Sequence, residues 1–344
     1  MDALPPLLEN ARLTVDTAVL VANWRAFARA SGSAACGAAV KADGYGLGAT
    51  DVARALVAAG CRDLFVAHWH EAMALGPQPD GVRVAVLHGV MSHEIDAALA
   101  SSALPVLVTA PQVQAWRATG RPCDIMVDTG MNRLGISIAE ARSGLLDGLA
   151  IATVHSHLAC AEDAASPTNE RQRAAFAELA AALPAQRYAL ANSAGVALGA
   201  GYHFGLTRPG IGLYGGRPGM AQVAHPSARI IQLRTVPVGE SIGYGATFTA
   251  SRPMRVAVVA LGYADGYPRS LSNQGGASID GIACPQVGRI SMDLTAFDVS
   301  AAPALAEGDW LDVDFDLART AAATGRSEYE LLTGLGARYA RIYR

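Results

Sequence analysis

Short apolar segments alternate with stretches of helical apolar spacing through the first part of this 344-residue chain, and this alternation limits the possible folds most strongly. The segments typical of strands occupy residues 38–40, 64–67, 82–87, 106–108, 124–127, 151–155, 188–190 and 206–211. Helical spacing is found before the first strand at 17–30, and then at 51–59, 71–75, 93–100, 111–118, 138–146, 169–183 and 193–198. Eight strands, mostly followed by helices, predict an α/β fold in which a parallel (β/α)8 barrel of the TIM type is favoured over an open doubly wound sheet.

The pattern changes after the glycine- and proline-rich run at 215–219. Strand-like segments then follow one another without helices between them, at 228–236, 254–259, 283–287, 294–299 and 310–315, with a helix returning between 317 and 332. Glycine and proline turns separate these strands, as in mainly β domains. The sequence therefore predicts two domains, a barrel over residues 1–225 and a mainly β domain over residues 226–344.

Composition excludes several classes of protein. The net charge of −3 provides no basic field for nucleic acid. The N-terminal MDALPPLLEN lacks the basic and apolar regions of a signal peptide, and no run of 18 apolar residues predicts a membrane span. The five cysteines are scattered and form no C-x-x-C pair, which is typical of reduced thiols. We expect a cytoplasmic protein that contacts neither nucleic acid nor membrane.

Lys41 is the most unusual residue of the predicted barrel. It ends the first strand, and Gly44, Gly46 and Gly48 allow a tight turn before the next helix. A lysine flanked by alanine and glycine at the end of a buried strand has no obvious solvated position, and burial lowers the pKa of an amine, which makes it a usable nucleophile or base. The ordinary alternative is a lysine in a surface loop.

Other polar residues follow the later strands of the barrel, at the ends where functional residues gather in this fold. They include Arg133 in DTGMNRLG (128–135), His157 in HSHL (155–158), Ser193 in ANS (191–193) and Arg208 in TRPGI (207–211). Each has a structural alternative: a turn cap for Arg133, a core histidine for His157, a helix N-cap for Ser193, and an ion pair with Asp128 for Arg208. No acidic pair or cysteine accompanies the histidines, so no metal site is predicted.

A dinucleotide site is a second interpretation of the glycine-rich turn. Gly44, Gly46 and Ala49 fit the pattern G-x-G-x-x-G/A. That fingerprint requires an acidic residue at the end of the next strand, about 20 residues further on. Here the next strand is followed by His68-Trp69-His70, with no acid before Glu71, so this interpretation is disfavoured.

The stretch A-V-K-A-x-x-Y-G-x-G around Lys41 resembles the lysine signature of the alanine racemases. VDTGMNRLG, H-x-H-L, LANS and TRPGIGLYG also resemble motifs of that family, as do GYGATF, LGYADGY and GRISMD in the second domain. The resemblance runs in the family's order from Arg12 to Arg344. It implies a pyridoxal-phosphate-dependent isomerase (fold type III) that interconverts L- and D-alanine through an external aldimine by a two-base mechanism and supplies D-alanine for peptidoglycan. It also implies a homodimer with shared active sites.

The resemblance further implies roles for particular residues. Lys41 would hold pyridoxal phosphate as a Schiff base and act as one base, and Tyr244 of the neighbouring subunit would be the other. Arg208 would bond to the pyridine nitrogen, and His157 would connect Arg208 with Tyr244. The phosphate would be held by Tyr45, Ser193, Gly210 and Ile211, with Asn192 beside them. Arg133 and the Met292 amide would bind the substrate carboxylate, and Tyr263 would line the entry.

Two positions depart from the family. Many relatives carry a lysine, often carbamylated, where this chain has Met126, and some carry a tyrosine where alignment gives Ala337. Two rival functions also remain. A fold-related decarboxylase of basic amino acids would place an acid, not Arg208, at the pyridine nitrogen. A non-catalytic carrier of pyridoxal phosphate would be a lone barrel, and the second domain would be unexplained.

Overall fold

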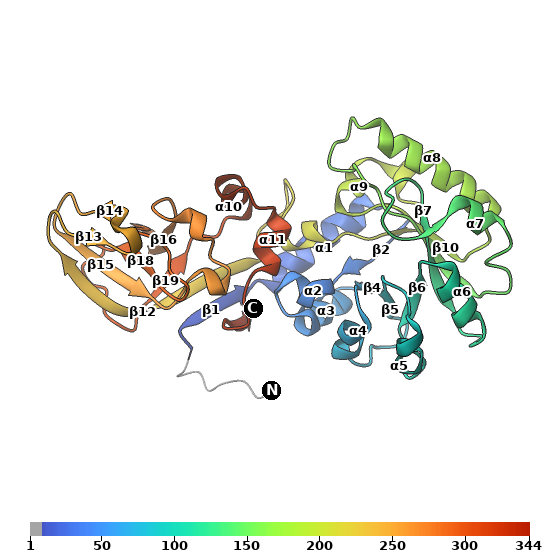
Figure 1. Cartoon of the computed structure of the whole chain (residues 1–344), viewed down its shortest axis with the longest axis horizontal. Coiled ribbons are helices and arrows are strands. Elements are labelled where there is room, and N and C mark those ends of the chain that lie inside the picture. The colour runs from blue at the N-terminus through green and yellow to red at the C-terminus, as the bar shows by residue number, and fades with distance from the viewer. Residues whose placement is uncertain (1–8) are drawn as a thin grey trace. The chain divides into compact units, whose positions relative to one another are not determined.

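The structure is a computed structural model that describes residues 9–344, and its chain divides into two units. One unit is Leu20–Met220; the other combines the described residues up to Val19 with Ala221–Arg344. The first contains most of the helices and the second most of the long strands, as the labels in Figure 1 show. Each unit is described by itself below.

The first unit is built on parallel strands. Each strand pairs with the next, in the order β3 (Ala38–Ala39), β4 (Asp63–Val66), β5 (Arg83–Val86), β6 (Leu104–Leu107), β7 (Cys123–Asp128), β9 (Ile151–His155) and β10 (Arg187–Ala189). The two-residue β8 (Ile136–Ser137) pairs with β7. The strands are rich in valine, alanine and leucine and are largely buried, as parallel strands covered on both faces must be.

Main-chain hydrogen bonds close this sheet into a barrel. β11 (Leu206–Thr207) pairs with β2 (Ala35–Cys36), which continues into β3 after Gly37. On the other side of β11, the Gly205 amide donates to the Tyr188 carbonyl at 3.1 Å. Gly37 has no room for a side chain, because a Cβ there would lie 2.7 Å from Cε2 of Phe65. With β2 and β3 counted as one strand, eight parallel strands surround the core, which confirms the predicted (β/α)8 fold.

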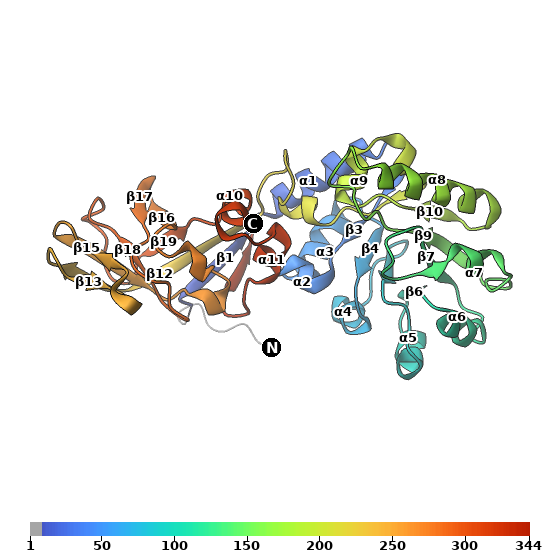
Figure 2. The same cartoon turned by 45° about the horizontal axis from the view of Figure 1, so that its top comes forward.

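The helices lie around the outside of the barrel strands (Figure 2). They are α1 (Thr17–Ala30), α3 (Ala49–Ala58), α4 (Trp69–Leu75), α5 (Ile95–Leu99), α6 (Ala110–Arg117), α7 (Ile138–Arg142), α8 (Pro167–Ala182) and α9 (Ser193–Ala197). Seven of the eight were predicted within a few residues. α7 ends earlier than predicted, and Gly144 follows it with a φ of +79°, a conformation that glycine adopts without strain.

The second unit is mainly β. Its long strand β12 (Ala224–Val236) pairs with β1 (Ala11–Val15), β15 (Met254–Val259) and β19 (Trp310–Val313). β1 also pairs with β20 (Ala340–Tyr343), so both ends of the described chain share one sheet. The remaining strands are β13 (Ser241–Ile242), β14 (Phe248–Thr249), β16 (Gly276–Ile279), β17 (Ile282–Pro285) and β18 (Thr295–Asp298). The helix predicted at 317–332 is two helices, α10 (Leu317–Thr324) and α11 (Glu328–Thr333), because Gly325 turns the chain at a φ of +68°.

Candidate active site

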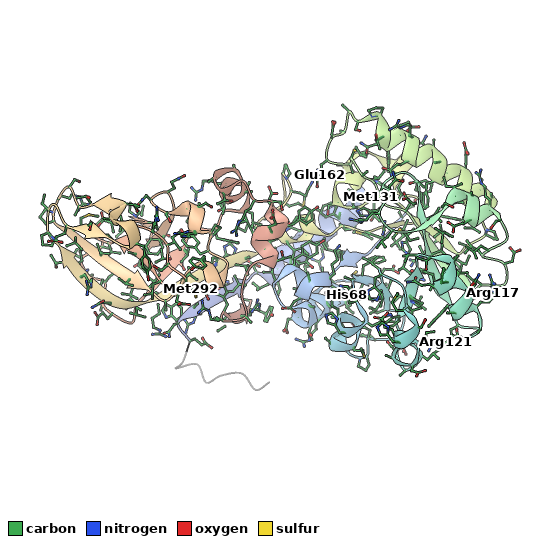
Figure 3. The ribbon with its side chains drawn as sticks, in the orientation of Figure 1. His68, Arg117, Arg121, Met131, Glu162 and Met292 are labelled. Carbon is green, nitrogen blue, oxygen red and sulfur yellow. The ribbon has the colours of Figure 1, made fainter. Side chains whose placement is uncertain are left out.

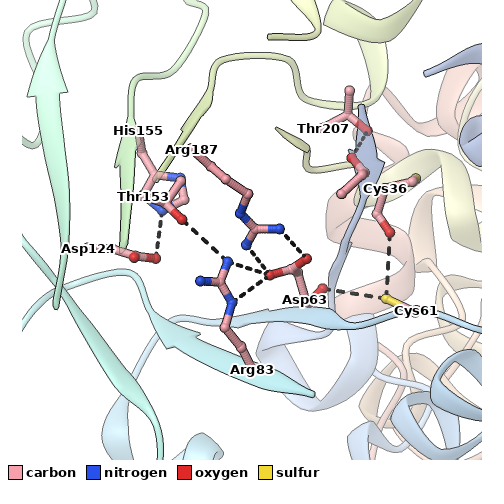
Figure 4. A network of polar contacts seen from close by, with 10 residues as sticks. Cys36, Cys61, Asp63, Arg83, Asp124, Thr153, His155, Arg187 and Thr207 are labelled. Atoms are coloured by element: carbon pink, nitrogen blue, oxygen red, sulfur yellow. Dashed lines mark hydrogen bonds and ion pairs between the residues drawn. The ribbon is translucent and has the colours of Figure 1, made fainter. Parts of the chain in front are cut away.

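A network of polar contacts joins side chains of several barrel strands (Figure 4). Asp63, at the start of β4, accepts hydrogen bonds from Arg83 at 2.8 Å and Arg187 at 3.0 Å. Further along the strands, His155 of β9 donates from Nε2 to Asp124 of β7 at 2.9 Å. In this fold the N-terminal ends of strands serve stability rather than chemistry. We therefore assign the Asp63 cluster to the scaffold.

Lys41 stands at the C-terminal end of β3 and begins α2 (Lys41–Tyr45). Burial lowers the pKa of its ammonium group, and the positive charges of Arg133 and Arg208 lower it further, whereas Glu71 opposes the shift. An amine in such surroundings is more easily deprotonated than a surface lysine. The structure thus brings Lys41 into the same electrostatic neighbourhood as both predicted arginines.

The segment α2 is not a right-handed helix. Ala42, Asp43 and Gly44 have φ values of +52°, +53° and +62°, and Tyr45 follows at +57°. Glycines were expected to turn the chain here, but three of these four residues carry side chains. Left-handed conformations are unfavourable for such residues, so other contacts must hold the turn.

The residues predicted to hold a phosphate lie together. Ser193 Oγ accepts hydrogen bonds from the amides of Gly210 at 2.8 Å and Gly212 at 3.2 Å. Tyr45 is buried, its ring stacks on that of Tyr214 with centroids 4.5 Å apart, and a Cβ at Gly210 would lie 2.3 Å from the Tyr45 hydroxyl. Two hydroxyl groups and a side-chain-free backbone thus form a polar cradle.

The cradle continues on both sides. Asn192, not Ser193, is the N-cap of α9, and its Oδ1 accepts from the Gly195 amide at 2.8 Å. The alternative role of Ser193 as a helix cap is therefore wrong, since its hydroxyl points to the Gly210 turn. Ile211 is buried and begins the short helix η4 (Ile211–Tyr214).

Arg208 is buried inside the barrel. Its Nη2 donates to the carbonyl of Ser156, and its guanidinium lies 5.8 Å from the centre of the Phe65 ring. Burial lowers the pKa of Arg208 to about 10, with Asp124 opposing this shift. Its Nε has no hydrogen-bond partner among residues 9–344. A buried donor without an acceptor is costly, so this atom suits an acceptor supplied by a ligand.

Arg208 does not pair with Asp128 as the structural alternative proposed. Asp128 Oδ1 instead accepts from the amides of Gly130 at 2.7 Å and Met131 at 2.9 Å, which shapes the loop that carries Arg133. Arg133 itself is exposed, and Met126 is buried within β7.

His157 lies just beyond β9, and its main-chain oxygen accepts from Gln172 at 2.9 Å. Burial lowers the pKa of His157 to about 3, and the charges of Arg208, Arg133 and Lys41 contribute in the same direction. The imidazole is therefore neutral at physiological pH. The charges of Lys41, Arg133 and Arg208 thus act on the pKa of His157, and these four predicted site residues follow different strands.

The other predicted residues lie on loops of the second unit. Tyr244, in η5 (Tyr244–Ala246), is 70% exposed, and Tyr263, in η6 (Tyr263–Asp265), is 42% exposed. Met292, which is labelled in Figure 3, is 54% exposed. The Tyr263 amide donates to the Ser291 carbonyl at 3.1 Å, and the Met292 carbonyl accepts from Ala264 at 3.0 Å. The loops of Tyr263 and Met292 therefore pack together and present their side chains to solvent.

Three buried or bridging groups were not predicted as functional: Asp124, His155 and Glu71. In the sequence, His155 was considered only as a possible metal ligand, and Glu71 only as an acidic residue too far along the chain for a dinucleotide site.

Within the described residues, no cluster of three histidine, cysteine or acidic side chains has the arrangement of a metal site. No helix among residues 9–344 is long and apolar enough to cross a lipid bilayer.

The barrel, the lysine at its rim and the mainly β unit that follows it in the chain fit an enzyme of the racemase type, and comparisons with known proteins specify the family. Residues 15–218 match the model of the alanine racemase N-terminal domain, and residues 223–343 match that of the C-terminal domain. The chain belongs to the alanine racemase family.

Individual relatives agree with this assignment. The catabolic alanine racemase of Agrobacterium fabrum is 42% identical over 97% of this chain and 92% of its own, and the biosynthetic enzyme of the same organism is 41% identical over 96% and 93%. The crystal structure of alanine racemase from Bartonella henselae, with covalently bound pyridoxal phosphate, is 36% identical. It covers 97% of this chain and 99% of its own, with a TM-score of 0.88.

Proposed function

We propose that this protein interconverts L- and D-alanine with pyridoxal phosphate attached to Lys41. The observation that carries the proposal is the surroundings of Lys41, whose lowered pKa has its causes in burial and in Arg133 and Arg208. Membership of the alanine racemase family supports the choice of substrate and cofactor.

The residues of the barrel fit this cofactor. The hydroxyls of Tyr45 and Ser193 and the Gly210–Ile211 backbone lie together and would hold the phosphate, with Asn192 capping the adjacent helix. The unpartnered Nε of Arg208 provides a donor for a ring nitrogen. When bound, pyridoxal phosphate withdraws electrons from the α-carbon of an amino acid and makes its proton acidic.

Arg208 would direct the outcome of the reaction. A guanidinium is a permanent cation and donates only, so it disfavours a proton on the ring nitrogen that it contacts. Arg208 would thereby limit the negative charge that passes to the ring, which would suppress transamination. A carboxylate at this position would have the opposite effect, and this distinguishes the chain from the rival decarboxylase.

Two bases serve the two faces of the substrate. Lys41 would remove or return the proton on one face, and Tyr244 would do so on the other. A tyrosine has an ordinary pKa near 10, so it needs cationic neighbours to act as a base near neutral pH. The neutral His157 would pass the influence of Arg208 to Tyr244. The high exposure of Tyr244 supports its being supplied to the site of a second subunit, in a homodimer.

The substrate would be held by its carboxylate. Arg133 is exposed on the loop after β7 and is close enough to lower the pKa of Lys41. Together with the Met292 amide it would bind the carboxylate and protect it from loss, while Tyr263 would line the entry. Cytoplasmic D-alanine made in this way would supply peptidoglycan, which complementation of a D-alanine auxotroph would test.

The decisive experiment is proton NMR of L-alanine in heavy water with the cofactor-loaded protein, followed by chiral analysis. We expect exchange of the α-proton together with appearance of D-alanine. Spectra of a lysine-bound cofactor without exchange would contradict the activity and favour the carrier, and release of carbon dioxide from lysine or arginine would favour the decarboxylase.

A further inference from the structure

One carboxylate ties the residue after Lys41 to the neighbouring strand. Glu71 Oε1 accepts from the Ala42 amide at 2.7 Å, and Glu71 Oε2 accepts from the amides of Ala67 at 2.6 Å and His68 at 3.1 Å. The bonds from Ala67 and His68 fix the end of β4 and the start of α4, near the labelled His68 in Figure 3. The bond from Ala42 joins this region to α2, the turn that follows β3. Glu71 is thus more than a helix cap.

The segment that Glu71 holds is under strain. Ala42, Asp43 and Tyr45 all adopt left-handed φ values between +52° and +57°, which residues with side chains rarely adopt. The far end of this turn is fixed by Asp43, whose Oδ1 accepts from the Ala49 amide at 2.9 Å. At the near end, the Ala42 amide donates to the Glu71 carboxylate. Such strain persists only where surrounding contacts maintain it.

We propose that Glu71 is a positioning residue for Lys41: its bond to the Ala42 amide maintains the left-handed turn and so directs the Lys41 amine into the site. This inference rests on the proposed role of Lys41 as the cofactor-bearing residue. The charge of Glu71 acts in addition, because it opposes the lowering of the Lys41 pKa by burial, Arg133 and Arg208.

Glu71→Gln tests the proposal. A glutamine offers one acceptor, and its amide group would place N–H against the N–H groups of Ala42 or of Ala67 and His68. The matched control is Glu140→Gln. Glu140 is likewise the third residue of its helix and accepts from the Ser137 amide at 2.8 Å, but it has no bond to the Lys41 turn.

The readout is attachment of cofactor to Lys41 in apoprotein, trapped by borohydride and located by mass spectrometry. We expect attachment about tenfold slower in E71Q than in wild type and unchanged in E140Q. The pH dependence of acylation of Lys41 in the apoprotein should also move to lower pH in E71Q, because an opposing negative charge has been removed. Loss of a helix cap alone would change neither result.

Ala42→Gly provides a rescue. Glycine adopts left-handed φ values without strain, so A42G should restore most of the attachment rate to E71Q while changing little by itself. If E71Q fails to fold, the attachment rate of the A42G/E71Q double variant is compared with that of A42G instead. Equal rates in E71Q and E140Q, or no rescue by A42G, would overturn the positioning role. Failure of wild-type Lys41 to take up cofactor would instead overturn the proposed function, and the inference with it.

Discussion

His155 donates a 2.9 Å hydrogen bond to Asp124 inside the barrel, and both side chains are almost completely buried. His155 Nδ1 and Asp124 Oδ1 have no further partner in the described part of the chain. The pair lies on adjacent strands, and Ser156, the residue after His155, accepts from Arg208. The pair therefore supports the strand end on which Arg208 is fixed.

Removal of one member of this pair should be costly. His155→Leu leaves the Asp124 carboxylate buried without its donor, and we expect a loss of about 3–5 kcal/mol in the free energy of unfolding. The double variant H155L/D124V removes both polar groups and should recover most of this loss. Urea unfolding of the apoproteins measures both. A double variant as unstable as H155L would show that packing, not the unpaired charge, sets the cost.

Stability should fall as the pH falls below about 6.5. Burial lowers the pKa of both His155 and His157, the latter to about 3, so the unfolded chain binds protons at a higher pH than the folded protein does. The stability that this difference provides is present above the unfolded pKa near 6.5. It is lost as the pH falls from that value towards the lower pKa of the folded state. The slope is at most about 1.4 kcal/mol per pH unit for each histidine.

Urea titrations of apoprotein between pH 7.5 and pH 5 measure this slope. The variant His157→Gln should reduce it, whereas replacement of an exposed histidine, His70, should leave it unchanged. An equal slope in H157Q and wild type would assign the pH dependence to other groups.

Gly210→Ala should weaken cofactor binding at least tenfold. The added Cβ would lie 2.3 Å from the Tyr45 hydroxyl, so Tyr45 must move out of the cradle, at a cost of about 1–3 kcal/mol for overpacking. Gly201→Ala is the control, because a Cβ there would meet its nearest neighbour, Arg173, only at 3.7 Å. Fluorescence titration with pyridoxal phosphate compares the two, and equal affinities would argue against the cradle.

Mixed dimers should test the sharing of active sites between subunits. Lys41→Ala and Tyr244→Phe are each expected to be nearly inactive. If the subunits exchange freely at equal concentrations, half of the dimers are mixed and each contains one intact site, so about a quarter of the wild-type activity should return. Activity that stays at the level of the separate variants would place both bases in one chain or exclude the dimer.

The sequence predicted the parts of the fold that depend on apolar periodicity. All eight barrel strands were located within a few residues because their apolar runs are separated by helical spacing. The two-residue β8, the four-residue β16 and the terminal strands β1 and β20 were not predicted as strands, because short segments carry little periodicity and their pairing is decided by distant residues.

The site was predicted less completely, for similar reasons. Lys41, Arg208 and Ser193 follow strands and could be placed on one rim from the barrel geometry alone. The left-handed turn at Ala42 could not be predicted, because alanine rarely adopts a positive φ and nothing in the sequence indicates one here. Glu71 has the ordinary position of a capping glutamate, and only the folded chain reveals its bond across to the Ala42 amide.

The pairing of β1 with β12 and β20 affects how the protein is made. In the sequence, the barrel residues separate β1 from its partner strands β12 and β20. During synthesis β1 therefore leaves the ribosome long before these partners and stays unpaired until they are made. The barrel can begin to fold during this interval. A gene fragment that starts at residue 221 would lack β1 and leave β12 with an unpaired edge, so the second unit should be expressed with residues 9–19 joined to it by a linker.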